Sequence, residues 1–164
     1  MSVDQAERDR RALVAGRRKA RHYAMQALYE WTVSGNSPAA IERHFREDFD
    51  LKGIDDAYFR ELLHEVPARA AELDECFAPL LQDRAIDELG HVERALLRIG
   101  SYELAQRIDV PYRVVIDEAV ALAKKFGATD SYKFINGVLD RLARELRRAE
   151  AASPVGRRGG DGAL

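Results

Sequence analysis

The sequence of 164 residues predicts an all-α protein. Apolar residues recur three and four positions apart along nearly the whole chain, the spacing of amphipathic helices. Glycine, proline and capping residues interrupt this pattern between the apolar segments. Apolar residues make up 46% of the chain and charged residues 33%, a balance typical of a globular domain with its own core.

Composition also excludes several classes of protein. No apolar run approaches the roughly 18 residues that a membrane span requires, and the charged N-terminus does not resemble a secretory signal. The single cysteine, Cys76, excludes a disulfide framework and a cysteine-based zinc site, so we expect a cytoplasmic protein.

The N-terminal part predicts a flexible tail followed by a helix. Residues 1–16 are expected to be the tail. From Ala20 to Trp31 the apolar residues recur at helical spacing and predict a helix that faces a core. Ser37 and Pro38 then predict the start of the next helix, as its N-cap and its first helical residue.

A long apolar segment follows, with Asp55 as its expected cap. Pro67 lies within it, and we expect a kink or a short break there, because proline removes a helix hydrogen bond and clashes one turn back. We expect two subdomains, residues 17–82 and 83–150, within one domain.

The C-terminal half predicts three more helices. The first contains Gly100, whose low helix propensity predicts another helix crossing closely at that point. Gly127 is expected to end the second helix as its C-cap, and Asp130 or Thr129 to cap the third. Residues 151–164 are rich in Ser, Pro, Gly and Arg and are expected to be disordered.

The charges are unevenly distributed. The net charge is −2, but residues 1–21 carry +4, residues 22–110 carry −9 and residues 111–164 carry +3. The basic ends predict contact with an acidic polymer such as nucleic acid, and the acidic middle predicts contact with a basic protein. The alternative, that these charges are solvated helix faces, is equally compatible with charge alone.

The residues predict no catalytic chemistry. The sequence has no Gly-rich phosphate loop, no HExxH pair and no two histidines one helical turn apart. Cys76 lies beside Leu73 and Phe77, which indicates a structural cysteine. We therefore predict a protein that is not an enzyme and that holds no metal or cofactor.

A basic run at the start of the first helix predicts binding to RNA. Arg17, Arg18 and Arg21 lie where the helix dipole disfavours cations, which suggests an external anion. Gln26 and Tyr29 follow on the same helix, and amide and aromatic groups beside arginines are typical of single-stranded RNA recognition. The alternative is a solvated basic turn with Tyr29 packed in the core.

A second cluster lies between the last two helices. Phe126 is expected at the rim of the loop, Asp130 to cap a helix or to accept from a base, and Lys133 to contact a phosphate. The alternative is helix capping without a ligand.

Several longer motifs occur in a recognisable order. AMQALYEW at 24–31 follows the basic run, and VERALLRI at 92–99, DVPY at 109–112, KKFG at 124–127 and FINGVLD at 134–140 come later. Taken together, these motifs resemble the NusB family of bacterial transcription antitermination factors, over roughly residues 17–145. One departure is Tyr132, where the family commonly has histidine.

The resemblance implies about seven helices in two packed three-helix bundles. It also implies binding to boxA RNA together with ribosomal protein NusE, in the RNA polymerase antitermination complex that transcribes ribosomal RNA operons. It leaves open whether the chain is a monomer or a homodimer. The residues expected on the NusE side are Glu93, Tyr102, Glu103 and Glu118.

Two other interpretations remain open. One is a NusB-like RNA-binding or helical interaction module without antitermination activity. The other is the NusB-like domain of an RNA cytosine methyltransferase, which we expect to require an additional Rossmann-like domain.

Overall fold

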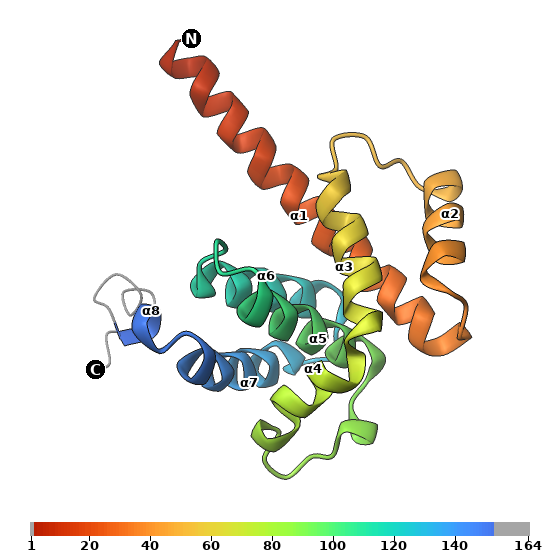
Figure 1. Cartoon of the computed structure of the whole chain (residues 1–164), viewed down its shortest axis with the longest axis vertical. Helices are drawn as coiled ribbons and strands as arrows, with labels where there is room; N and C mark the ends of the chain where they lie inside the picture. Colours follow the sequence, from red (N-terminus) through yellow and green to blue (C-terminus); the bar gives the residue numbers. More distant parts are fainter. Residues whose placement is uncertain (1, 153–164) are drawn as a thin grey trace. The chain divides into compact units, whose positions relative to one another are not determined.

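The computed structural model describes residues 2–152, and over this range the chain is all-α without a β-strand, as predicted (Figure 1). Among these residues, no helix is long and apolar enough to cross a membrane. The elements are α1 (Val3–Ser34), α2 (Pro38–Asp48), α3 (Asp56–Ala68), α4 (Ala70–Phe77), two 3-10 turns (Ala78–Leu80 and Ile86–Glu88), α5 (His91–Gln106), α6 (Tyr112–Phe126), α7 (Ser131–Leu146) and α8 (Arg148–Ala152).

The helices form two compact units that divide between Ala68 and Arg69. This boundary differs from the expected division after residue 82. Pro67 lies in the last turn of α3, where its missing N–H leaves the Leu63 carbonyl without its usual helical donor. The expected interruption is a break, because α3 ends at Ala68 and α4 begins at Ala70.

Unit 1 contains α1, α2 and α3. Its core is built from the apolar faces of all three helices, and its fully buried members include Ala24, Leu28, Ile41, Phe59 and Leu62. The predicted caps of α2 and α3 are confirmed. The Ser37 side chain accepts from Ala40 N at 3.1 Å, and the Asp55 carboxylate accepts from Tyr58 N at 3.1 Å.

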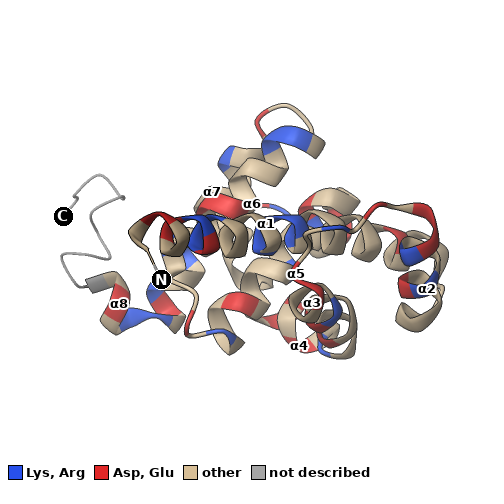
Figure 2. Ribbon diagram, turned by 90° about the horizontal axis from the view of Figure 1, so that it is seen from above, with Lys and Arg blue, Asp and Glu red and all other residues tan. Residues whose placement is uncertain are grey.

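The structure begins α1 at Val3, so the expected flexible tail is helical from that residue onward. Ser2 is the N-cap and accepts from Gln5 N at 3.1 Å. Glu7 pairs with Arg10 and with Arg11 one turn along the helix, and acidic and basic segments both occur along α1 (Figure 2). Capping and local ion pairs favour a helix without needing an apolar face. Apolar spacing alone therefore does not predict this segment as a helix.

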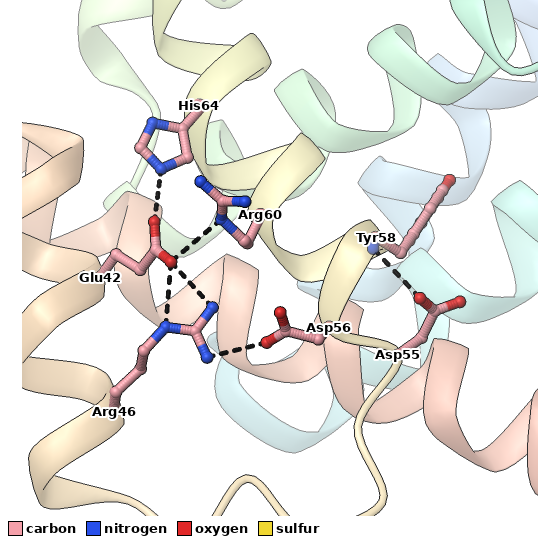
Figure 3. Close-up of polar contacts among 7 residues, drawn as sticks. All are labelled: Glu42, Arg46, Asp55, Asp56, Tyr58, Arg60 and His64. Carbon is pink, nitrogen blue, oxygen red and sulfur yellow. Dashed lines mark hydrogen bonds and ion pairs between the residues drawn. The ribbon is translucent and has the colours of Figure 1, made fainter.

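Polar contacts hold α2 against both neighbouring helices. On the α3 side, Glu42 accepts from His64 at 2.6 Å, from Arg60 at 3.1 Å and from Arg46 at 2.8 Å, and Arg46 also pairs with Asp56 at 2.8 Å (Figure 3). Burial acts to raise the pKa of Glu42, but the hydrogen bonds from His64 and Arg46 outweigh it and lower the pKa.

On the α1 side, His44 Nε2 contacts the Glu30 carboxylate at 2.6 Å, and its other ring nitrogen lies 3.2 Å from Asp48. The hydrogen bond to Glu30 raises the pKa of His44 above its ordinary value, against a smaller opposing effect of burial. The contact between α1 and α2 is therefore strongest when His44 carries its proton.

We expect this contact to make stability depend on pH. The stabilisation from charged His44 is complete below the ordinary histidine pKa of about 6.5 and is lost as the pH rises through the raised pKa. The urea midpoint should fall over this pH range, and His44→Gln should remove that part of the fall. If the parent and His44→Gln show the same dependence of the urea midpoint on pH, the contact between His44 and Glu30 does not contribute to stability.

In unit 2, α5, α6 and α7 pack against one another, and α4 packs on α5. The predicted close crossing at Gly100 is confirmed, because a Cβ there would lie 2.8 Å from Leu139 Cδ2 of α7. Arg98 of α5 is 7% exposed and donates two hydrogen bonds to the Asp74 carboxylate of α4, both at 2.8 Å.

The end of α7 is held by Arg147, which is 3% exposed. Its guanidinium donates to main-chain carbonyls at the end of α5 and in the following loop, and to the Glu150 carboxylate at 2.6 Å. Those carbonyls belong to Glu103 (3.1 Å), Leu104 (2.8 Å), Arg107 (2.9 Å) and Val110 (3.0 Å). Of the tail expected to be disordered, residues 151 and 152 belong to α8, and residues 153–164 lie outside the described residues.

Candidate nucleic-acid interface

The basic run lies where α1 first meets the rest of unit 1. Gly16 is buried, its carbonyl accepts from Asp55 N at 3.0 Å, and a Cβ at Gly16 would lie 3.0 Å from the Gly53 carbonyl oxygen. This close approach explains the glycine. Residues 2–15 before it are exposed apart from half-buried Glu7, whereas α1 has a buried face after it.

Two of the three predicted RNA-contacting arginines are used inside unit 1. Arg17 Nε donates to the Asp55 carboxylate at 3.2 Å, and its guanidinium lies 3.8 Å from the centroid of the Tyr58 ring. Arg21 is only 4% exposed and lies 5.5 Å from the same ring. Cation–π contacts of this kind hold α1 against α3. The expectation that Arg21 faces a ligand is therefore corrected, because its side chain is buried.

Arg18 and Tyr29 are the exposed members of the predicted set, and Tyr29 keeps 41% of its surface exposed. The alternative that Tyr29 packs in the core is therefore wrong. Arg18, half-buried His22 and Tyr29 are four and seven residues apart, which places them on one face of α1, here called the α1 stripe. Gln26 is half-buried beside it, and its amide donates to the His22 carbonyl at 3.5 Å.

The second predicted cluster lies in unit 2, from the end of α6 to the first turn of α7. Phe126 is 37% exposed, with Lys125 Nζ 5.4 Å from its ring centroid. Lys124 Nζ and Lys133 Nζ lie 4.8 Å and 5.9 Å from the centroid of the Tyr132 ring. We call these five residues the lysine–aromatic loop.

Sequence reasoning selected Phe126 and Lys133 but did not select Lys124, Lys125 or Tyr132 as site residues. The available signal was the pair of lysines in the last turn of α6. Ammonium groups beside the exposed Phe126 ring and the half-buried Tyr132 ring suit a polymer with phosphates and stacking bases.

Asp130 lies at the N-cap position of α7, but its role differs from the prediction. Its φ of 67° is left-handed, and its carboxylate makes no capping hydrogen bond among the described residues. It lies instead 3.5 Å from Lys133 Nζ. Gly127 ends α6 as predicted, in an extended conformation with φ −85° and ψ 171°. Its lack of a side chain matters because a Cβ would lie 2.7 Å from the Ala123 carbonyl oxygen.

Glu93, predicted to face a protein partner, holds the start of α7 instead. Its carboxylate accepts from Arg84 at 2.8 Å, from the Ser131 hydroxyl at 2.7 Å and from Gly90 N at 3.1 Å. Burial acts to raise the pKa of Glu93, but the bonds from Arg84 and Ser131 outweigh it and lower the pKa. Glu93 thereby positions the residue that follows Asp130.

The other predicted partner residues differ in exposure. Tyr102 is 5% exposed and Glu103 is 1% exposed, whereas Glu118 on α6 is half-buried. Of the four, Glu118 is the one whose carboxylate is best placed for an outside contact.

The geometry offers binding chemistry rather than a metal centre. Among residues 2–152, no three His, Cys, Asp or Glu side chains are grouped to hold a metal ion. Burial raises the pKa of the Cys76 thiol, which disfavours the reactive thiolate. The α1 stripe and the lysine–aromatic loop lie in different units, and each presents a cation and an exposed ring to solvent.

Comparisons with known proteins identify similar chains. The model of the NusB family matches residues 18–144. The transcription antitermination proteins NusB of Pseudomonas fluorescens and Saccharophagus degradans are 57% and 54% identical over 136 residues, 83% of this chain and 81% and 91% of theirs. A solved structure of T. maritima NusB matches with a TM-score of 0.58 and 30% identity, over 78% of this chain and 90% of that one. The relatives are named transcription antitermination proteins, which confirms the prediction of a protein that is not an enzyme.

Proposed function

The chain belongs to the NusB family, and on this premise we propose that it acts in transcription antitermination by binding boxA RNA together with ribosomal protein NusE. In this role it joins RNA polymerase and other Nus factors in the bacterial cytoplasm. The observation that carries the RNA part is the α1 stripe, where an exposed arginine and an exposed tyrosine share one helix face.

Both the α1 stripe and the lysine–aromatic loop contact RNA in this proposal. On the α1 stripe, Arg18 pairs with a phosphate and the Tyr29 ring stacks on a base. In the lysine–aromatic loop, the three ammonium groups neutralise phosphates, and Phe126 offers a second exposed ring. Arg17 and Arg21 contribute indirectly, by fixing α1 against α3.

For the protein partner, one face of α6 is the best candidate. Val114, Asp117 and Glu118 are three and four residues apart on this helix, so they lie together. Val114 is 39% exposed, Asp117 is exposed and Glu118 is half-buried. An apolar side chain flanked by carboxylates suits a basic protein surface, and NusE is the partner that we propose for it.

Asp130 should limit RNA affinity, because its carboxylate lies beside Lys133 and repels phosphates. Asp130→Asn should tighten RNA binding, most clearly at low salt. Stability should change by less than about 0.5 kcal/mol, because asparagine also tolerates a left-handed φ. Asp130→Ala should lose about 1 kcal/mol through backbone strain. If the parent and Asp130→Asn bind RNA equally well across a salt titration, the RNA does not pass close to Asp130.

Co-purification with the cognate NusE, followed by gel shifts on boxA and scrambled RNA, tests the proposed function. We expect a stable complex that shifts boxA at lower concentration than scrambled RNA. Association with NusE without any RNA shift would support a helical interaction module instead. RNA binding without NusE or boxA preference would support a general RNA-binding module.

A further inference from the structure

The first part of α1 forms an exposed helical arm, residues 3–15. These residues precede the segment that the family model matches, which starts at residue 18. They are exposed apart from half-buried Glu7, and α1 first becomes buried at Gly16. In Figure 1 the arm projects beyond α2 and α3 of its own unit. The fold of unit 1 therefore gives no packing reason for the arm.

Residues 3–15 carry three arginines and three carboxylates, so the arm as a whole is neutral, but cations gather around a shallow apolar hollow at its end. The hollow is lined by Arg10, Arg11, Val14, Ala15 and Arg18. The Arg10 and Arg11 side chains are 70% and 77% exposed, and both pair with the one carboxylate of Glu7. Two guanidinium groups share one negative charge, so the hollow keeps a net positive charge. Such a surface suits a flexible anionic polymer with apolar sugar and base faces.

The arm is also in register with the α1 stripe. Arg11, Arg18, His22 and Tyr29 follow one another at intervals of seven, four and seven residues, which keeps them on one side of a helix with 3.6 residues per turn. Arg18 belongs to both the hollow and the α1 stripe. Arg11 lies about 10 Å from Arg18 along the axis, at 1.5 Å per residue.

We propose that the arm binds the phosphate backbone of single-stranded RNA that continues beyond the bases contacted at Tyr29. This inference rests on the proposed RNA-binding function and extends its RNA path along the same helix. Arg10 and Arg11 contact phosphates, and the methyl groups of Val14 and Ala15 contact sugars or base faces. The hollow is lined by arginine, valine and alanine, so the arm adds affinity without reading base sequence through amide groups.

A helical protein partner fits the arm less well than RNA. Val3, Leu13 and Val14 are 86%, 71% and 50% exposed and lie on one side of the helix, but Arg10 lies between them on that side. The arm therefore has no continuous apolar seam for another helix. An exposed helix of this length is marginal alone, so contact with RNA should also increase its order.

Fluorescence anisotropy with two RNAs tests the arm. The probes are boxA alone and boxA with uridine tracts at both ends, each titrated over a range of salt. The parent chain is compared with the double variant Arg10→Gln and Arg11→Gln, which keeps good helix formers. Arg8→Gln is the matched arm control, because Arg8 is exposed but does not line the hollow.

On the long RNA, the double variant should flatten the slope of log K against log salt by about 1.4, or about 0.7 for each lost phosphate contact. It should bind the short RNA as the parent does, and Arg8→Gln should match the parent on both. An unchanged slope on the long RNA overturns the arm proposal while leaving the proposed function intact. If the parent binds neither RNA, both the arm proposal and the proposed function are overturned. If the double variant changes only the self-association of the protein, the arm binds a second copy of the chain instead of RNA.

Discussion

Replacing Arg147 with alanine is expected to destabilise unit 2 by about 3–5 kcal/mol. The guanidinium is buried and donates to four main-chain carbonyls at the end of α5 and in the loop after it. Alanine removes all these donors at once. The Glu103 and Arg107 carbonyls still accept from Arg107 N and Val110 N, but those of Leu104 and Val110 lose a buried donor, and an unsatisfied buried acceptor costs about 1–3 kcal/mol. Glu150 also loses its partner, although its carboxylate still accepts from Tyr112 N at 2.9 Å.

Urea unfolding of Arg147→Ala and of Arg144→Ala measures this effect against a matched control. Arg144 lies one turn earlier, is 71% exposed at its side chain and pairs with Asp140 on the same helix. An exposed pair of this kind contributes little, so Arg144→Ala should stay within about 0.5 kcal/mol of the parent. Equal losses in the two variants would show that the Arg147 contacts do not hold unit 2 together.

Replacing Asp74 with alanine should cost about 3–5 kcal/mol, because it leaves the Arg98 guanidinium buried without its two-fold carboxylate partner. Arg94 loses a second, longer contact with the same carboxylate at 3.8 Å. The pair is the main polar tie between α4 and α5 among the described side chains, so its loss should loosen α4.

Thermal melts of three variants separate the buried charge from the loss of the pair. Asp74→Ala should melt far below the parent. The control Asp140→Ala should melt close to the parent, because Asp140 is half-buried and pairs with Arg144, whose side chain is 71% exposed. Adding Arg98→Met to Asp74→Ala should recover part of the loss, because an apolar side chain then replaces the unpaired cation. If the single Asp74→Ala variant melts at the same temperature as the parent, the Asp74–Arg98 pair does not hold α4 against α5.

Much of the fold could be predicted from local sequence. Apolar spacing predicted the helices, and the caps at Ser37 and Asp55 depend on residues within one turn. Gly100 predicted a helix crossing because a glycine inside a helix needs a packing reason. The helical arm was not predicted, because it lacks the apolar face on which that reasoning depends.

The site was only partly predictable, because exposure depends on contacts between residues far apart in the sequence. Arg17, Arg18 and Arg21 look alike in the sequence. Yet Tyr58 contacts both Arg17 and Arg21, and Asp55 binds Arg17, whereas Arg18 stays exposed. The burial of Glu103 likewise follows from tertiary packing. Asp130 is a residue type that commonly caps helices, but here its φ is left-handed and its carboxylate lies 3.5 Å from Lys133 Nζ instead of capping α7.

The central claim is that the α1 stripe binds RNA, and a salt titration of the Arg18→Ala and Tyr29→Ala double variant tests it most directly. Arg18 is exposed and Tyr29 keeps 41% of its surface exposed, so the variant should remain folded, and its melting curve is recorded beside that of the parent. Its affinity for boxA RNA should fall by about 1–3 kcal/mol from lost stacking, with a further loss and a shallower salt slope from the missing phosphate contact. A folded double variant with the parent's affinity and salt slope would contradict the claim.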